Sequence, residues 1–265
     1  MDALIAAFED HLRIMVVRAQ ARVAGYLQKQ LSTDAEGVIL TSRANARVLR
    51  TLDDVFLREM DDLGWESLVN AFVGEFPGQL PFLNETIRSL SDQMATPLAI
   101  QKLSMADTSL LAGLQLNAST SLHMALEGVA GNAVQTVLMS VGGLKFTDLV
   151  QALSEKLNIA TGRARGLADT AMATWYRTAT DRAFQAIEKG LPEQEQRYKY
   201  TAGPDDKKTR PFCHRLIQAA KTYTRDQIAE MSNGQLPNVL LTCGGWNCRH
   251  QWLLAIPAVA MKKAA

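Results

Sequence analysis

The stretch RARGLADTAMATWYRTATDRAFQAIEK, residues 163–189, carries the strongest helical pattern in the chain and decides the fold class. Its stripe of apolar and small side chains comprises Ala168, Met172, Trp175, Ala179, Ala183 and Ile187. A stripe at this spacing packs into the core of a helical bundle. Gly190 follows as the expected stop.

The chain upstream repeats the helical pattern. Residues 1–31 have apolar side chains three or four positions apart, which predicts a first helix. Thr33-Asp34-Ala35-Glu36 matches a capping box and predicts the start of a second helix. The apolar face of that helix runs from Val48 to Leu63.

Prolines and glycines predict the next boundaries. Pro77-Gly78 and Pro81 indicate a break, and a helix from about Asn84 to Met94 follows, which Pro97 closes. Two more helices are expected. One spans residues 106–141, where Gly128 and Gly131 interrupt it or allow close packing, and a short one spans residues 147–157, with Thr147 as its cap.

The pattern changes after Gly190. Expected strands are RYKYT (197–201), which ends in a turn at Gly203-Pro204, VLLT (239–242) and CRHQWLLAI (248–256). Short helices are expected at 214–220 and after a second capping box, Thr224–Gln227. The sequence thus predicts a mainly α protein: a helical bundle domain for interaction or oligomerisation, residues 1–190, and a small α+β domain, residues 191–265.

Composition limits the functional classes. Hydrophobic residues make up 47% of the 265 residues, enough for a sizeable core, and the formal net charge is +1. A near-neutral chain argues against electrostatic attraction to nucleic acid or membranes as the main function. Three cysteines do not make a disulfide scaffold. We find neither a signal-peptide pattern nor an apolar run long enough to span a bilayer.

Five of the seven Cys and His residues gather in two segments, DKKTRPFCHRL (206–216) and CGGWNCRHQW (243–252). In a strand, Cys248 and His250 would point to the same face, and Cys213 would join them if its loop folds back. Sulfur and imidazole ligands suit zinc, and such an ion would stabilise a domain with little core. The sequence therefore predicts a zinc site on these three residues.

The fourth ligand is left open by the sequence. Cys243 is the first candidate, His214 the second and Asp206 the third. The spacing is not that of a zinc finger, because no CxxC pair is present. The alternative is that the cysteines are small buried apolar residues and that His250 is a hydrogen-bonded core histidine.

The same residues allow an enzymatic interpretation. In a metal-dependent nuclease, His214 or His250 would be the base, and Arg210 or Arg249 would hold a phosphate. No acidic metal cluster supports it in the sequence. We therefore expect no catalytic residues, and we expect Arg210 and Arg249 to lock a loop near the site.

The runs YKYTAGPDDKKTRPFCHRL, TRDQIAEMSNGQ and GGWNCRHQW resemble the C-terminal domain of the Mu F-like family of phage head morphogenesis, or minor head, proteins. The resemblance covers about residues 161–257. Eight residues match the order and spacing of the family motifs: Asp206, Thr209, Arg210, Cys213, Asn247, Cys248, Arg249 and His250. The chain departs from the Thr-Cys form of the motif by having Arg210 in place of a cysteine.

The resemblance implies a structural virion component. Such a protein lies in the capsid interior near the portal, in several copies, after assembly in the host cytoplasm. It acts in head assembly or DNA ejection. The alternatives are a metal-dependent nuclease and a DNA-binding protein carried with the phage genome. The implied partners of the virion component are the portal protein and, further, the major capsid or scaffold protein and phage DNA. The resemblance also implies zinc on Cys213, Cys248 and His250, with Asp206 and Thr209 beside the site.

Overall fold

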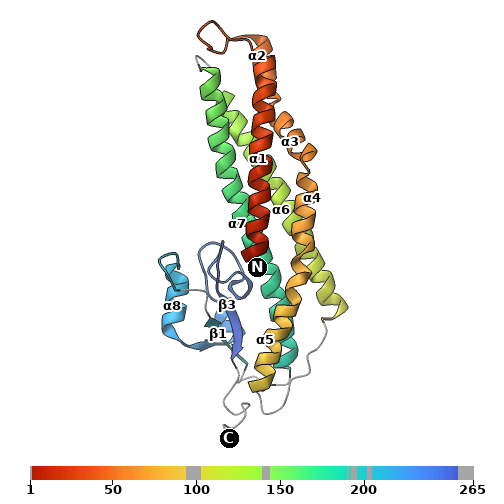
Figure 1. Cartoon of the computed structure of the whole chain (residues 1–265). Coiled ribbons are helices and arrows are strands. Elements are labelled where there is room, and N and C mark those ends of the chain that lie inside the picture. Colours follow the sequence, from red (N-terminus) through yellow and green to blue (C-terminus); the bar gives the residue numbers. More distant parts are fainter. Residues whose placement is uncertain are drawn as a thin grey trace. The chain divides into compact units, whose positions relative to one another are not determined.

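The structure is a computed structural model that describes residues 2–93, 103–138, 144–189, 191, 196–201 and 205–255 (Figure 1). It is mainly helical and has a small C-terminal antiparallel sheet, as the sequence predicted. In its described part, no helix combines the length and apolar character that a bilayer span requires. The long elements are α1 (Asp2–Gln30), α2 (Arg43–Arg50), α3 (Leu52–Asp62), α4 (Trp65–Gly74), η1 (Phe76–Gln79), α5 (Leu80–Gln93), α6 (Met105–Leu138) and α7 (Phe146–Glu188).

The C-terminal part has shorter elements. They are β1 (Arg197–Thr201), α8 (Pro211–Ala219), β2 (Thr222–Tyr223), α9 (Arg225–Ala229), α10 (Val239–Thr242) and β3 (Gln251–Ala255). The chain forms two compact units: Met1–Val73 with Ala118–Ala168, and Gly74–Asn117 with Asp169–Ala265. This division passes through α6 and α7 and does not follow the chain at residue 190.

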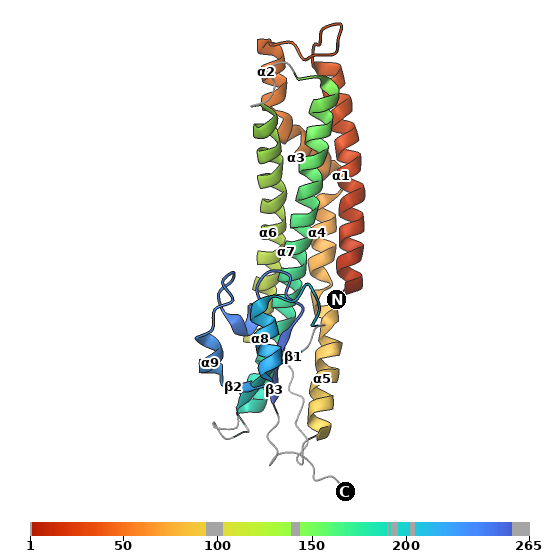
Figure 2. The same ribbon diagram turned by 90° about the vertical axis from the view of Figure 1, so that its left-hand side faces the viewer.

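The first unit is a helical bundle around α1. Figures 1 and 2 show α1 alongside the first half of α7, and an ion pair of 2.7 Å joins Glu9 to Arg165 there. The Phe8 ring lies 4.6 Å from the Phe72 ring and 6.3 Å from the Trp65 ring, measured between centroids. The Trp65 indole is buried and donates to Nδ1 of His123 at 3.0 Å. The indole N–H of Trp65 is thus buried with a hydrogen-bond acceptor.

The helix start predicted at Thr33 is wrong. The Asp34 carboxylate accepts from the Val38 amide at 2.8 Å and closes a tight turn there. Helix α2 has a different cap, since Ser42 Oγ accepts from the Asn45 amide at 3.0 Å. A Ser, Thr, Asp or Asn side chain serves a turn as readily as a cap, so the pattern alone did not decide between them.

Several predicted boundaries in the helical region also differ. The helix expected along Val48–Leu63 is divided at Thr51 into α2 and α3. The helices expected at 147–157 and 163–189 are one helix, α7, with Thr147 inside its first turn. Isolated glycines reduce helix stability by only about 1 kcal/mol each. Accordingly, Gly128 and Gly131 lie within α6 without interrupting it.

The predicted helix near Asn84 starts earlier, at Leu80, with Pro81 in its first turn. Proline is tolerated there because the backbone N–H that it lacks would have no partner within the helix. The predicted strand VLLT is a short helix, α10, in which Cys243 N–H donates to the Val239 carbonyl at 2.8 Å. Other predicted boundaries lie outside the described residues: Met94, Pro97, Gly190, Gly203 and Pro204.

The second unit contains the sheet, whose strand order is β2-β1-β3. Both pairs are antiparallel, and Tyr200 in β1 lies opposite Trp252 in β3. The predicted capping box at Thr224 is confirmed at the start of α9. Arg225 of α9 forms ion pairs with Asp181 at 2.6 Å and Glu188 at 2.9 Å, both on α7. These pairs fasten the short α9 to the long α7 within this unit.

Candidate metal centre

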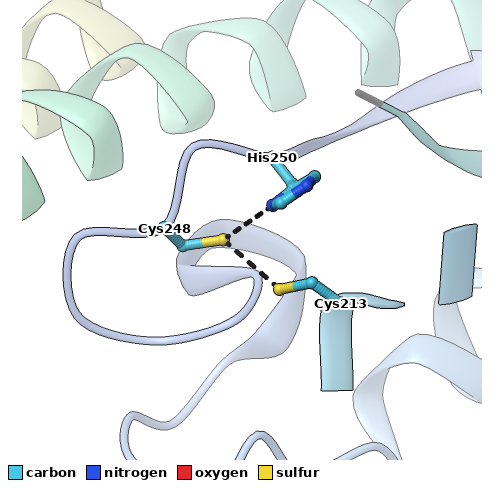
Figure 3. A group of neighbouring side chains, drawn as sticks. All are labelled: Cys213, Cys248 and His250. Atoms are coloured by element: carbon cyan, nitrogen blue, oxygen red, sulfur yellow. Dashed lines mark hydrogen bonds between the residues drawn. The ribbon is translucent and has the colours of Figure 1, made fainter. Parts of the chain in front are cut away.

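Two separate segments of the second unit meet at the Cys/His cluster (Figure 3). Cys213 lies in α8, which begins at Pro211 directly after the extended Arg210. Cys248 and His250 lie in the segment between α10 and β3. The strand predicted from Cys248 onward begins only at Gln251, yet the two side chains still point toward the same place.

The predicted three-residue cluster is present in the structure. Its three ligand atoms, one from each of Cys213, Cys248 and His250, all lie within 4.8 Å of one another, and all three residues are buried. The two sulfur atoms are 3.8 Å apart. The Cys248 sulfur is 3.7 Å from Nδ1 of His250. Such a buried Cys₂His group could hold a metal ion.

The backbone around Cys248 forms a tight loop that approaches the sulfur atoms closely. The Gly244 amide donates to the Cys248 sulfur at 3.1 Å. A Cβ atom at Gly244 would lie 2.2 Å from the Cys213 sulfur. Cys243 and Asn247 take positive φ angles of 52° and 55°, which are uncommon outside glycine. The loop therefore holds a strained backbone and requires glycine beside the thiols.

Electrostatics couple the two cysteines. The hydrogen bond with Cys213, more than that from the amide of His250, lowers the pKa of Cys248. The same bond and burial raise the pKa of Cys213. Burial, followed by the charges of Cys243 and Cys248, raises the pKa of Tyr200. The site thus concentrates negative charge in a buried place, which a cation would neutralise.

His250 has an unsatisfied side. Its imidazole is 3% exposed, and its Nε2 atom has no hydrogen-bond partner among the described residues. The ring stacks on Tyr200, with centroids 5.5 Å apart and planes at 18°. Nδ1 faces the Cys248 sulfur. Core histidines and metal-bound histidines both usually hydrogen-bond through the second nitrogen, so the orphaned Nε2 favours neither, whereas Nδ1 is placed to bind an ion beside the Cys248 sulfur.

The motif residues around the cluster lock two loops together. The Arg249 guanidinium forms two hydrogen bonds to the Asp206 carboxylate, at 2.7 and 2.9 Å. The Thr209 hydroxyl accepts from the Asp206 amide at 2.9 Å. Arg210 donates to the carbonyls of Gly244, at 3.3 Å, and Trp246. These bonds join the loop before α8 to the loop that carries Cys248.

The three candidates for a fourth ligand lie elsewhere. In the described parts of the chain, the Cys243 thiol is buried but falls outside the 4.8 Å group, and burial raises its pKa to about 12. His214 bonds through Nδ1 to Asp205 at 2.9 Å. Asp206 is taken up by Arg249. None of these three belongs to the 4.8 Å group, although the Cys243 thiol lies close enough for its charge to affect Cys213 and Tyr200.

Sequence reasoning missed three residues that position the site. Tyr200 Oη donates to the Cys213 sulfur at 3.2 Å. Arg177 on α7 is buried and donates to the carbonyls of Leu241, at 3.3 Å, and Cys248. Thr170 Oγ1 accepts from an amide of the same loop at 3.1 Å. Arg177 lies two positions after Trp175 and off the predicted apolar stripe, so the helical periodicity gave no signal for its burial.

Comparison of the chain with models of protein families, with curated proteins and with solved structures gives no match. The account of the site consequently rests on its own geometry. That geometry provides two thiols, one imidazole and several amide and hydroxyl donors in a buried space. Such a set could hold a cation and shield it from water.

Proposed function

We propose that the chain is a structural minor head protein of a tailed phage and that a zinc ion on Cys213, Cys248 and His250 stabilises its C-terminal part. The resemblance to the Mu F-like family suggests the first half of this proposal. The observation that carries the second half is the buried three-residue cluster, with its sulfur atoms 3.8 Å apart.

Zinc fits the cluster in both chemistry and spacing. Tetrahedral zinc with bonds of about 2.3 Å to sulfur and about 2.0 Å to nitrogen places two sulfurs about 3.8 Å apart and sulfur and nitrogen about 3.6 Å apart. The observed separations are 3.8 Å between the sulfurs and 3.7 Å from Cys248 to His250. These two separations fit tetrahedral zinc as they stand, and the third, between Cys213 and His250, lies within 4.8 Å.

The charged motif residues support a structural role. Arg210 bonds to loop carbonyls and Arg249 to Asp206, so both guanidinium groups are used within the protein. Hydrogen bonds of this kind orient the loops that carry metal ligands. They favour a domain stabilised by an ion over one that presents arginines to a phosphate.

A nuclease is the alternative that the sequence suggested. His250 is buried, and its Nδ1 faces a thiol, an arrangement that suits a ligand better than a base. His214 is exposed, but both of its nitrogens bond within the protein, to Asp205 and to Gln218 at 2.8 Å. These contacts favour the structural role.

The proposed place of the chain is the capsid interior near the portal, where the portal protein is its principal partner. Quantitative mass spectrometry of purified particles of the encoding phage tests this location. We expect several copies of the chain per particle and its cross-linking to the portal protein. Its absence from purified particles would contradict the proposal.

A further inference from the structure

A fourth buried polar atom lies against the two sulfurs of the cluster. The Tyr200 hydroxyl oxygen is 3.2 Å from the Cys213 sulfur and 3.6 Å from the Cys248 sulfur. Tyr200 belongs to β1, so it comes from a different element than the other three residues. Its side chain is 4% exposed. The hydroxyl thus lies inside the same closed space.

These two distances are close to those that a tetrahedral site requires. With zinc bonds of about 2.3 Å to sulfur and about 2.0 Å to oxygen, a sulfur and an oxygen ligand lie about 3.5 Å apart. The two observed separations lie on either side of this value. Without an ion, the hydroxyl can donate to the Cys213 sulfur and accept from the Cys248 thiol, so both contacts can also be hydrogen bonds until a metal binds.

The position of Tyr200 is fixed by its neighbours. Trp252, opposite it in β3, packs edge-on at 4.7 Å between ring centroids. Phe212 packs edge-on from α8 at 6.4 Å, and His250 stacks on its face. A ring held on three sides keeps its hydroxyl oriented at the sulfurs before any ion binds, which is the pre-organisation that a metal site requires.

We propose that the Tyr200 oxygen is the fourth ligand of the ion, which completes a Cys₂-His-Tyr site with Cys213, Cys248 and His250. This inference rests on the proposed zinc site and goes beyond it. Four protein ligands close the coordination sphere, whereas catalytic zinc keeps one position for water. A closed sphere agrees with an ion that stabilises the fold.

The test uses the full chain, zinc and two matched variants. Tyr200→Phe removes the proposed ligand atom. Tyr198→Phe is the control, because Tyr198 is equally buried on the same face of β1 and its hydroxyl bonds to Arg225 instead of the thiols. Zinc affinity is measured by competition with a chelator, and phenolate formation by the near-ultraviolet difference spectrum on zinc loading. Circular dichroism verifies that each variant is folded.

We expect zinc loading to produce the phenolate spectrum in the wild type and in Tyr198→Phe, and not in Tyr200→Phe. The Tyr200→Phe affinity should fall by more than about 100-fold, beyond the 10- to 100-fold typical of residues that only orient a ligand. Zinc bound by the wild type with no phenolate spectrum would overturn the assignment of Tyr200 and leave the three-residue site intact. A wild type that binds no zinc would overturn both proposals.

Discussion

At the residue scale, the closest approach in the site is between the backbone at Gly244 and the two thiols. Any side chain there must occupy space that the Cys213 sulfur fills, 2.2 Å from an added Cβ. The Gly244 amide also donates to the Cys248 sulfur. Glycine at this position is therefore a requirement of the cluster and not of the backbone angle alone.

Gly244→Ala is expected to separate the thiols and to reduce zinc affinity by at least about 10-fold, the lower range for residues that orient ligands. Chelator competition measures it. Gly234→Ala is the matched control, since Gly234 has a positive φ of 72° and no atom within 4 Å of an added Cβ. The Gly234→Ala variant should lose stability but keep the zinc affinity of the wild type. Equal affinities for both variants would contradict the close-approach argument.

Asp206 has a pH dependence that follows from its bond to Arg249. That bond, more than the amide of Lys208, lowers the pKa of Asp206 from 3.8 to about 2. A lowered pKa means that the contact is complete above about pH 4 and is lost as pH falls through about 2. Carbon-detected NMR titration should give this midpoint, and Arg249→Gln should raise it toward 3.8. An unchanged midpoint in the variant would contradict the pairing.

At the element scale, apolar periodicity predicted which segments are helical, whereas capping motifs were a poorer guide to where the helices start. The apolar stripes of α1 and α7 were visible because burial selects every third or fourth residue. The same capping pattern marks a helix at Thr224 and a turn at Thr33. The difference lies in Asp34, whose carboxylate bonds to the amide of Val38, and in Gly37 with its φ of 78°. Such local competition is decided by the fold and not by the motif.

The fusion of two predicted helices into α7 makes Gly162 a test position. It lies in the helix interior, and an added Cβ would meet no atom within 4 Å. Gly162→Ala should therefore increase the free energy of unfolding by about 0.5–1 kcal/mol. Denaturant titration measures the change. A loss of stability would indicate that the helix is broken or crowded at this point.

At the scale of the whole molecule, the sequence predicted the three cluster residues but not what holds them. Cys213, Cys248 and His250 stood out because their residue types are rare in the chain. Tyr200 and Arg177 could not be found this way, since their roles depend on how β1 and α7 pack within the second unit. Contacts between distant segments leave no local pattern in a sequence.

The Arg225 pairs test how the second unit is fastened. The guanidinium contacts Asp181 and Glu188 and lies 4.8 Å above the Tyr198 ring. Arg225→Met should cost about 3 kcal/mol, because it leaves two mostly buried carboxylates without their cation. Arg13→Met, which removes an exposed pair with Asp10 at 3.4 Å, should cost under about 1 kcal/mol. Denaturant titration measures the free energy of unfolding of both variants. Similar losses in the two would contradict a special contribution of the Arg225 pairs.

The central claim is that the Cys/His cluster binds a metal ion that stabilises the protein. Elemental analysis of the chain, purified without chelators, measures the zinc content directly. The account predicts about one zinc per chain, as for a tetrahedral structural site, and none in Cys248→Ser. A wild type that contains no zinc or other transition metal would contradict the claim, and the cluster would then be a buried group of thiols beside a core histidine.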